Sequence, residues 1–374
     1  MKLVTVNNAR NVSGCEENQL DLARWFRSER GCETVFFVRD ESILGDRAEA
    51  QGFPVRRVFR GGIGRLTSLF TLARALYQEQ PDIVSINREH NIYPVYAALK
   101  MVQPCMKHTP LMVAVFHSPT GRRYPLLQRF DGVVCTSEYT GESFFANNDG
   151  LRERTEIIPY GTLLPRVECA EKEKDQRQRR LFEQRAFPLV GMVGDLWKNQ
   201  AELVDVANLV RDEFPGITIA VVGAGSVETI AELRKKIETS GLQENFIISG
   251  RIDRARIPDL FFDFDVSLST YRHEGFGIVH IESLAAMTPL IAYNSGGIRE
   301  IVRHGGGILV DGGIQEFAAA LAGLLRDGER RRALGREGRC VVEEFFTMDM
   351  MCRTHFEFYR SLFDKKFKSK EAIA

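Results

Sequence analysis

The sequence has 374 residues, of which 44% are hydrophobic and 27% charged, and its 50 basic residues balance 50 acidic ones. This length is about two and a half times a typical domain, so two domains are expected, and the apolar content excludes a disordered or fibrous chain. The balanced charge argues against a broad nucleic-acid-binding face. The cysteines number seven and none lies in a Cys-x-x-Cys pair, which disfavours a disulfide scaffold and a structural zinc site and fits a reducing compartment.

The beginning of the sequence does not resemble a signal peptide, because only a short apolar run, 3–6, follows Lys2 before Asn7 and Asn8. No stretch approaches the roughly 18 uncharged apolar residues that a membrane-spanning helix needs. We therefore expect a cytoplasmic protein, either free or held peripherally at the inner face of the membrane.

Short apolar runs alternate with longer amphipathic segments along the whole chain. Several runs are nearly continuous in Val, Ile and Leu, as is typical of parallel strands covered on both faces. The expected strands are 3–6, 35–38, 83–86, 111–116, 132–135 and 157–158, then 189–193, 217–222, 246–248, 266–268, 290–293 and 308–310. The clearest helical segments are 18–30, 66–79, 201–214, 228–240 and 348–363. Strand followed by helix, about six times in each half, predicts an α/β protein of two doubly wound domains.

A boundary between the two halves is expected after Pro165. The segment 168–185 is dominated by charged and Gln residues and shows no strand pattern, so we interpret it as a surface helix or linker. The domains are then 1–165 and 166–347. Ligands of doubly wound domains bind at the carboxyl ends of the strands, so the residues that follow each apolar run carry the functional information.

The most informative of these segments is 273–286, which follows the expected strand 266–268 and begins a helix near Gly277. Glycines let the backbone approach a ligand, and a helix start offers unpaired N–H groups, so this is a phosphate or sugar-oxygen site. Glu274 on the loop and Glu282 on the helix suit the vicinal hydroxyls of a ribose or hexose. On spacing alone, a loop glutamate and a solvated helix glutamate explain them equally well.

Along most of its length the sequence resembles the retaining family-4 glycosyltransferases of the GT-B fold (glycosyl transferases group 1). The signature of that family is a pair of glutamates separated by seven residues, then a Pro-hydrophobic strand, then a Gly-Gly…Glu-Ile loop. The corresponding residues are Glu274-Gly275-Phe276-Gly277…Glu282-Ser283, Pro289-Leu290-Ile291-Ala292 and Gly296-Gly297-Ile298-Arg299-Glu300-Ile301. The resemblance implies two Rossmann-like domains facing across a cleft. Residues 1–165 would form the acceptor-side domain, on which a last helix at about 348–374 packs, and residues 166–347 the nucleotide-sugar donor domain.

The resemblance also implies roles for individual residues. His117, at the end of strand 111–116, and Glu274 are the catalytic candidates, in contact with the donor sugar, while Glu282 would hold the ribose. Lys198 and the backbone of 275–278 would bind the diphosphate. The donor-binding candidates are Gly14, Lys198, Gly223, Arg251, Gly275, Phe276, Gly277, Ile278 and Glu282, and the acceptor candidates are Arg88 and His90.

Three positions depart from the family pattern, and one of them is Met287, where a glycine is common before the Pro289 strand. The segment Ser13-Gly14-Cys15-Glu16 has one glycine where members usually have two, in Gly-Gly-x-Glu. Asp195 stands where many members carry an arginine, so one of the two expected diphosphate cations is missing, which leaves more of the load to Lys198 or Arg299.

These expectations together favour a hexosyltransferase that moves a sugar from a nucleotide diphosphate sugar to a hydroxyl of a glycan or lipid-linked acceptor, with retention and in a polysaccharide biosynthesis setting. No Asp-x-Asp triplet occupies a suitable loop, so no metal and no cofactor besides the donor are expected, and no nucleic-acid partner. Two alternatives stay open. One is a sugar-nucleotide 2-epimerase of the same architecture, and the other is a non-catalytic nucleotide-sugar-binding protein.

A run of arginines in the first half has two interpretations. Its members, with no acidic residue between the first and the last, are Arg56, Arg57, Arg60, Arg65 and Arg74. Leucines and a phenylalanine recur at helical spacing within 66–76. A basic, partly apolar helix of this kind suits peripheral contact with anionic lipid. The stripe is no wider than the inward face of a packed helix requires, and this second interpretation is the favoured one.

Overall fold

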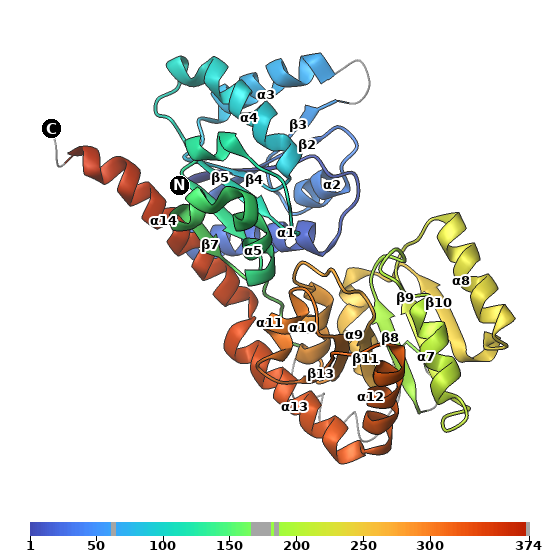
Figure 1. The fold of residues 1–374 in the computed structure, drawn as a ribbon. Helices are drawn as coiled ribbons and strands as arrows, with labels where there is room; N and C mark the ends of the chain where they lie inside the picture. The colour runs from blue at the N-terminus through green and yellow to red at the C-terminus, as the bar shows by residue number, and fades with distance from the viewer. Residues whose placement is uncertain (61–64, 166–180, 183–186, 372–374) are drawn as a thin grey trace. The chain divides into compact units, whose positions relative to one another are not determined.

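The computed structural model describes residues 1–60, 65–165, 181–182 and 187–371, so most of the expected linker 168–185 lies outside the described residues. The chain divides into two compact units. The first unit comprises Met1–Gly161 and Met348–Ala374, and the second comprises Thr162–Thr347. Each unit is built on one parallel sheet with helices on both faces (Figure 1).

The first unit has a seven-stranded sheet in the order β3-β2-β1-β4-β5-β6-β7. The strands are β1 (Lys2–Asn7), β2 (Glu33–Arg39), β3 (Val55–Phe59), β4 (Ile83–Ile86), β5 (Leu111–Phe116), β6 (Gly132–Cys135) and β7 (Thr155–Ile157). Its helices are α1 (Gly14–Arg30), α2 (Ile43–Ala50), α3 (Arg65–Glu79), α4 (Ile92–Val102), α5 (Glu138–Asn148) and α14 (Met348–Glu371). The sequence analysis did not predict β3, because two arginines interrupt its apolar residues. An edge strand such as β3 tolerates them, since it is less enclosed than its neighbours.

The last helix, α14, packs on the first unit. Phe26 of α1 lies edge-on to Phe356 and Tyr359 of α14, with ring centroids 5.8 and 6.1 Å apart. The Trp25 indole N–H donates a 2.8 Å hydrogen bond to Asp349, and the Tyr359 hydroxyl reaches Ser85 of β4 at 3.2 Å. The amphipathic face of α14 therefore completes the core of a unit whose other elements lie some 200 residues earlier in the chain.

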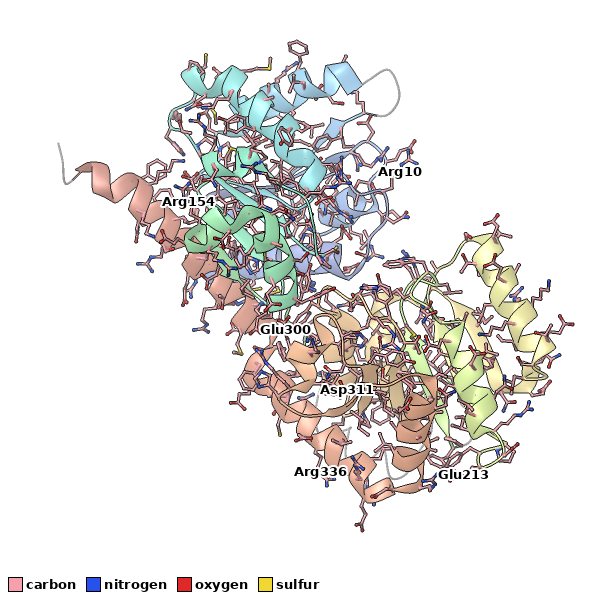
Figure 2. All side chains as sticks on the ribbon, viewed as in Figure 1. Arg10, Arg154, Glu213, Glu300, Asp311 and Arg336 are labelled. Carbon is pink, nitrogen blue, oxygen red and sulfur yellow. The ribbon has the colours of Figure 1, made fainter. Side chains whose placement is uncertain are left out.

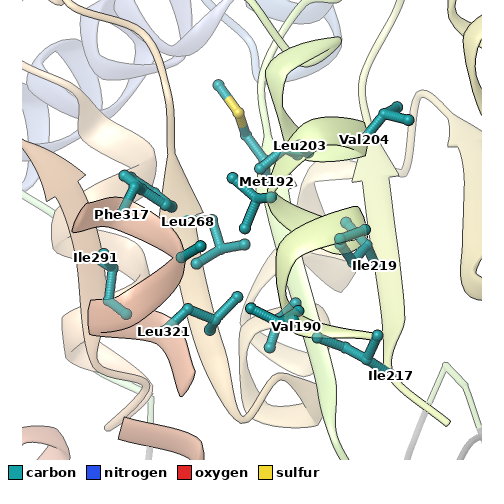
Figure 3. Packing of buried hydrophobic residues seen from close by; sticks show 14 of the residues in the cluster. Val190, Met192, Leu203, Val204, Ile217, Ile219, Leu268, Ile291, Phe317 and Leu321 are labelled. Atoms are coloured by element: carbon teal, nitrogen blue, oxygen red, sulfur yellow. The ribbon is translucent and has the colours of Figure 1, made fainter. Parts of the chain in front are cut away.

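The second unit has a six-stranded sheet in the order β10-β9-β8-β11-β12-β13. The strands are β8 (Leu189–Val193), β9 (Thr218–Val222), β10 (Phe246–Gly250), β11 (Val266–Ser269), β12 (Leu290–Tyr293) and β13 (Gly307–Val310). Its helices are α7 (Glu202–Val210), α8 (Val227–Thr239), α9 (Ile257–Asp263), α10 (Ile278–Ala285), α11 (Ile298–Val302), α12 (Ile314–Arg326) and α13 (Gly328–Phe345). Side chains of β8, β9 and β11 interlock with those of α7 and α12 to form its largest core, as seen for Val190, Ile219, Leu268 and Leu321 (Figure 3).

Both sheets reverse direction beside their first strand. In the first unit the chain winds outward through β1, β2 and β3, then returns to place β4 against the other side of β1. In the second unit β8 lies likewise between β9 and β11. A reversal of this kind is the topological switch point at which doubly wound proteins bind ligands. The loops after β1 and β4, and after β8 and β11, are therefore the places where a site is expected.

The arginine run does not form a single basic helix, which corrects that part of the sequence analysis. Arg56 and Arg57 belong to strand β3, where Arg57 pairs with Asp46 at 2.8 Å and with Glu49 at 2.9 Å. Leu72 and Leu76 of α3 are fully buried, as the favoured core-facing interpretation requires.

Gly191, in the middle of β8, is a packing-critical position that tests this core. A Cβ atom there would overlap the ring of Phe264, which is fully buried and packs edge-on against Phe261. Gly191→Ala should therefore lower the free energy of unfolding by about 1–3 kcal/mol, the usual cost of overpacking. Urea titration followed by circular dichroism measures this. Gly216→Ala is the matched control, because nothing lies within 4 Å of a Cβ there; an equal cost for both variants would contradict the packing described.

Candidate functional site

An ion pair stands at the switch point of the second unit. Lys198 follows β8 and Glu274 follows β11, and the Lys198 Nζ lies 2.6 Å from Glu274 Oε2. The side chains of Lys198 and Glu274 are only 19% and 13% exposed to solvent. Thr270, just after β11, donates a 2.9 Å hydrogen bond to the backbone carbonyl of Asn199 and so joins the two loops. Two residues that the sequence analysis assigned to diphosphate and sugar are thus brought together.

The two glycine motifs of the sequence meet beside this pair. The Gly297 N–H donates a 2.8 Å hydrogen bond to the Glu274 carbonyl, and a Cβ at Gly297 would overlap the Gly275 carbonyl. Gly277 adopts φ +97°, and a Cβ there would overlap the buried ring of His280. Only glycine fits either position, so these residues allow the loop to approach closely and α10 to begin at Ile278 with its first N–H groups toward the loop.

Some residues of that loop have buried side chains, so only their backbone can contact a ligand. The ring of Phe276 is 1% exposed and packs against Phe346, with centroids 5.6 Å apart, and Ile278 is also buried. Phe276 and Ile278 can therefore meet a ligand only through the backbone. Burial lowers the pKa of His280 to about 4, so this histidine is neutral beneath the loop at physiological pH.

The other predicted donor residues lie on neighbouring loops of the same unit. The Gly223 N–H donates to the Gly250 carbonyl at 3.0 Å, which sets the loops after β9 and β10 side by side. Arg251 comes next and lies 3.9 Å from Asp195, the residue that replaces the usual arginine. Both of those side chains are about half exposed, so the pairing is a surface one.

Glu282 is held by a partner that the sequence analysis missed. It is 8% exposed on α10 and forms an ion pair with Arg254, which follows β10. Arg254 lies 28 positions before its partner, in a segment with several other basic residues, so no spacing rule distinguishes it.

A second ion pair stands at the switch point of the first unit. Arg88, after β4, reaches the fully buried carboxylate of Glu16 on α1, with Nη2 and Oε1 2.6 Å apart. The same carboxylate accepts hydrogen bonds from the backbone and hydroxyl of Ser13, at 2.9 and 2.6 Å, and from Asn7, at 3.1 Å. Gly14, the predicted donor-side residue, is the first residue of α1 and adjoins this cluster. Burial alone would raise the pKa of Glu16, but the Arg88 charge and these hydrogen bonds together lower it to about 2.

Two histidines complete the predicted set in the first unit. His117 follows β5, and its Nδ1 shares a hydrogen bond with the Tyr160 hydroxyl. Burial lowers the pKa of His117 to about 4, although the Glu16 carboxylate opposes the shift, so the imidazole is neutral at physiological pH. His90 forms a hydrogen bond with Asn8 and lies two residues from Arg88. Tyr160 was not among the sequence candidates, because nothing in its spacing indicates a contact with His117.

Metal ligands do not gather in the described part of the chain. No group of three or more His, Cys, Asp or Glu side chains there is arranged to hold an ion. The metal-independent chemistry expected from the sequence remains a prediction.

Two doubly wound domains in one chain define the GT-B class of fold, and solved structures of that class match this one. The structure of Anabaena HepE in complex with UDP and glucose covers 96% of this chain and 100% of its own, with a TM-score of 0.80 and 21% identity. A glycosyltransferase from Rickettsia africae has a TM-score of 0.81 and 16% identity over 96% of this chain and 98% of its own.

Sequence comparison narrows the class to a family. The family model described as Glycosyltransferase Family 4 matches residues 12–162, and the one described as Glycosyl transferases group 1 matches residues 171–341. The chain belongs to these family-4 glycosyltransferases. A GDP-mannose-dependent alpha-(1-6)-phosphatidylinositol monomannoside mannosyltransferase of Mycobacterium tuberculosis is 31% identical over 62% of this chain. A 2-deoxystreptamine glucosyltransferase of Streptomyces kanamyceticus is 27% identical over 59%. The matches span 62% and 58% of those relatives' own lengths.

The buried Glu16 carboxylate predicts an acid-sensitive first unit. Because its pKa is lower in the folded protein than the ordinary value near 4.3, it stabilises the fold above that value and loses this contribution as pH falls toward about 2. The free energy of unfolding should therefore fall between about pH 5 and pH 2, and less steeply in Glu16→Gln. Glu142→Gln, at an exposed position on α5, is the control and should keep the wild-type slope. Denaturant titrations across this pH range test it, and identical slopes for wild type and Glu16→Gln would refute it.

Proposed function

We propose that the chain transfers a hexose-type sugar from a nucleoside diphosphate sugar to a hydroxyl group of a glycan or lipid-linked acceptor, with retention of anomeric configuration. The observation that carries this proposal is the Lys198–Glu274 pair beside the start of α10. A diphosphate takes the lysine from the glutamate, because its charge is larger and the helix start adds a positive field. The released Glu274 carboxylate then accepts hydrogen bonds from the sugar hydroxyls.

The chemistry follows from how charge develops. Negative charge grows on the leaving diphosphate while the sugar acquires oxocarbenium character. Lys198 and the backbone N–H groups of 275–278 stabilise the diphosphate, and stabilisation of this kind is usually the largest contribution to rate. Glu282 accepts hydrogen bonds from the ribose, and Arg254 pairs with its carboxylate and holds it in place. Neutral His117 offers a hydrogen bond to the sugar rather than a charge. The β-phosphate takes the proton of the acceptor hydroxyl. The proposal includes no metal and no cofactor besides the donor.

The relatives support a nucleotide sugar as donor. One is described as GDP-mannose-dependent and acts on a phosphatidylinositol monomannoside, and solved structures of HepE contain UDP, UDP and glucose, or UDP-glucose. Their named substrates differ, so the proposal here specifies a nucleoside diphosphate hexose and a hydroxyl acceptor, with polysaccharide or glycolipid assembly as the setting and the cytoplasmic side of the membrane as the place.

A panel of nucleotide sugars, assayed with and without acceptor, tests the proposal. Transfer to an acceptor, with the product anomer determined by NMR, supports it. Conversion of the donor into its C2 epimer without acceptor would instead identify the epimerase, and tight donor binding without any turnover would identify the binding protein.

Glu274 is predicted to be the most damaging single position. Glu274→Ala should reduce turnover at least about a hundredfold, because the lost hydrogen bonds act on the reacting sugar, while folding changes little. Glu213→Ala is the matched control, since Glu213 is also a carboxylate in an ion pair of the second unit but pairs with Arg326 at the surface (Figure 2). Steady-state kinetics with the preferred donor measure both variants. Near-normal turnover in Glu274→Ala would remove this residue from the site.

We include peripheral membrane contact in this proposal, and two neighbouring helices of the first unit support it. Helices α3 and α4 pack against each other (Figure 1) and leave large apolar side chains in solvent. These are Phe70, Tyr77, Tyr93 and Met101, which are 65%, 48%, 54% and 46% exposed. Arg74 and Lys100 are exposed on the same helices. Aromatic and basic residues together suit an anionic lipid surface. No helix in the described ranges is both long and apolar enough to cross a bilayer.

Sedimentation with vesicles tests this contact. The protein should sediment with phosphatidylglycerol vesicles at low salt and be released at about 0.5 M NaCl, where charges are screened within a few ångström. Phe70→Ser combined with Tyr93→Ser should abolish sedimentation. Leu209→Ser, which removes a side chain of similar exposure on α7 of the second unit, should not. A wild-type protein that stays in the supernatant at low salt would exclude the contact.

A further inference from the structure

An aromatic pair stands beside the Lys198–Glu274 ion pair and has no part in the function proposed so far. Trp197 lies on the loop after β8 and Tyr271 on the loop after β11, so the two rings straddle the switch point of the second unit. Their centroids are 5.3 Å apart and their planes are at 87°. The Lys198 Nζ lies 5.6 Å from the centroid of the Trp197 ring and 5.7 Å from that of Tyr271.

The two rings differ in how they are held. Tyr271 packs against the main hydrophobic core of the unit and also contacts His273, with ring centroids 6.0 Å apart. Trp197 packs edge-to-face on Tyr271 and remains 63% exposed. Among the described residues, none forms a hydrogen bond with its indole N–H. Packing on the core therefore fixes the tyrosine, while most of the surface of the tryptophan is available to contact a ligand.

The side chains around Trp197 indicate which kind of ligand the exposed ring binds. A pyranose has an apolar face of C–H groups and a rim of hydroxyls, and it needs an aromatic ring for the face and polar groups for the rim. Trp197 supplies the aromatic ring, and Tyr271 packs against it at 87° and holds it in place. Glu274 and the indole N–H supply an acceptor and a donor at the same place. In the absence of a diphosphate, the Lys198 ammonium is attracted to both rings. This attraction keeps the three side chains together.

We propose that the exposed Trp197 ring, held at nearly a right angle against Tyr271, forms an aromatic wall that stacks against the face of a pyranose ring next to Lys198 and Glu274. This rests on the proposed function, and it adds a determinant of sugar binding to it. The ring belongs either to the donor or to the acceptor, since both would carry the same C–H face to the same switch point.

Binding measurements on Trp197→Ala and Trp197→Phe distinguish the two sources. Calorimetry is run with UDP, UDP-glucose, GDP and GDP-mannose, and the gain in affinity that the sugar adds to the nucleotide is compared between variants. For a donor ring, Trp197→Ala should lose about fivefold to tenfold of that gain, leave the affinity for the nucleotide alone unchanged, and be largely rescued by Trp197→Phe. For an acceptor ring, the donor affinities stay at wild-type values and the acceptor KM rises by about the same factor.

Either of those patterns supports the wall. Unchanged donor affinity together with an unchanged acceptor KM would overturn it, as would equal weakening of UDP and UDP-glucose, which would place the base or phosphate on the ring. The chain has two tryptophans, so Trp25→Phe leaves Trp197 as the only tryptophan, whose emission can be excited selectively. Protection of its emission from acrylamide by methyl glycosides then tests the wall without turnover. If no donor binds and no transfer occurs, the proposed function is wrong. The quenching experiment still shows in that case whether Trp197 binds a sugar ring.

Discussion

Charge at the two switch points is the constraint on which the rest of the structure depends. A doubly wound sheet brings two strand ends together where its winding reverses, and in this chain each reversal holds one cation against one carboxylate. In the first unit the pair is Arg88 and Glu16, and in the second it is Lys198 and Glu274. Removing such groups from water is costly, and the pairing and surrounding hydrogen bonds offset that cost. Around the pairs lie the glycines that let loops approach, the hydrogen bond from Ser13 to Glu16 and the hydrogen bond from Thr270 to the loop of Lys198.

The two pairs are built for different tasks. Glu16 is satisfied by Arg88, Ser13 and Asn7 and has no exposed surface, so its carboxylate is a fixed part of the first unit. Glu274 keeps some exposure, and the lysine that holds it has a single compact charge on a flexible stem. A carboxylate held in that way can change partners at little cost when an anion arrives. This difference supports the proposal that Glu274 binds sugar hydroxyls while Glu16 has a structural role.

Much of the fold was predictable because parallel strands and their helices have strong periodicities. All twelve expected strands appear, with ends shifted by a few residues, while β3 was missed because Arg56 and Arg57 interrupt it. Glu274 was found from a motif that directly follows a strand, and Lys198 from the resemblance to the family. Glu16, Tyr160 and Arg254 were not among the candidates, because their roles depend on partners 72, 43 and 28 positions away, at Arg88, His117 and Glu282. The periodicity of a sequence segment predicts which face of a single helix or strand is buried. Contacts between residues of different elements form only when the sheet assembles, so periodicity cannot predict them.

The departure at Asp195 acquires a physical meaning from its surroundings. Around the loops of the second unit the side chains Lys198, Arg251 and Arg254 face Asp195, Glu274 and Glu282, so three positive charges meet three negative ones. These three ion pairs are therefore neutral as a group before any ligand binds. The Asp195–Arg251 pair is half exposed and weak, whereas the other two are largely shielded from water. Under the proposed function, an arriving diphosphate interacts most strongly with Lys198 and the start of α10. Asp195 then lowers the positive potential near Arg251 and leaves the charge of Lys198 in place.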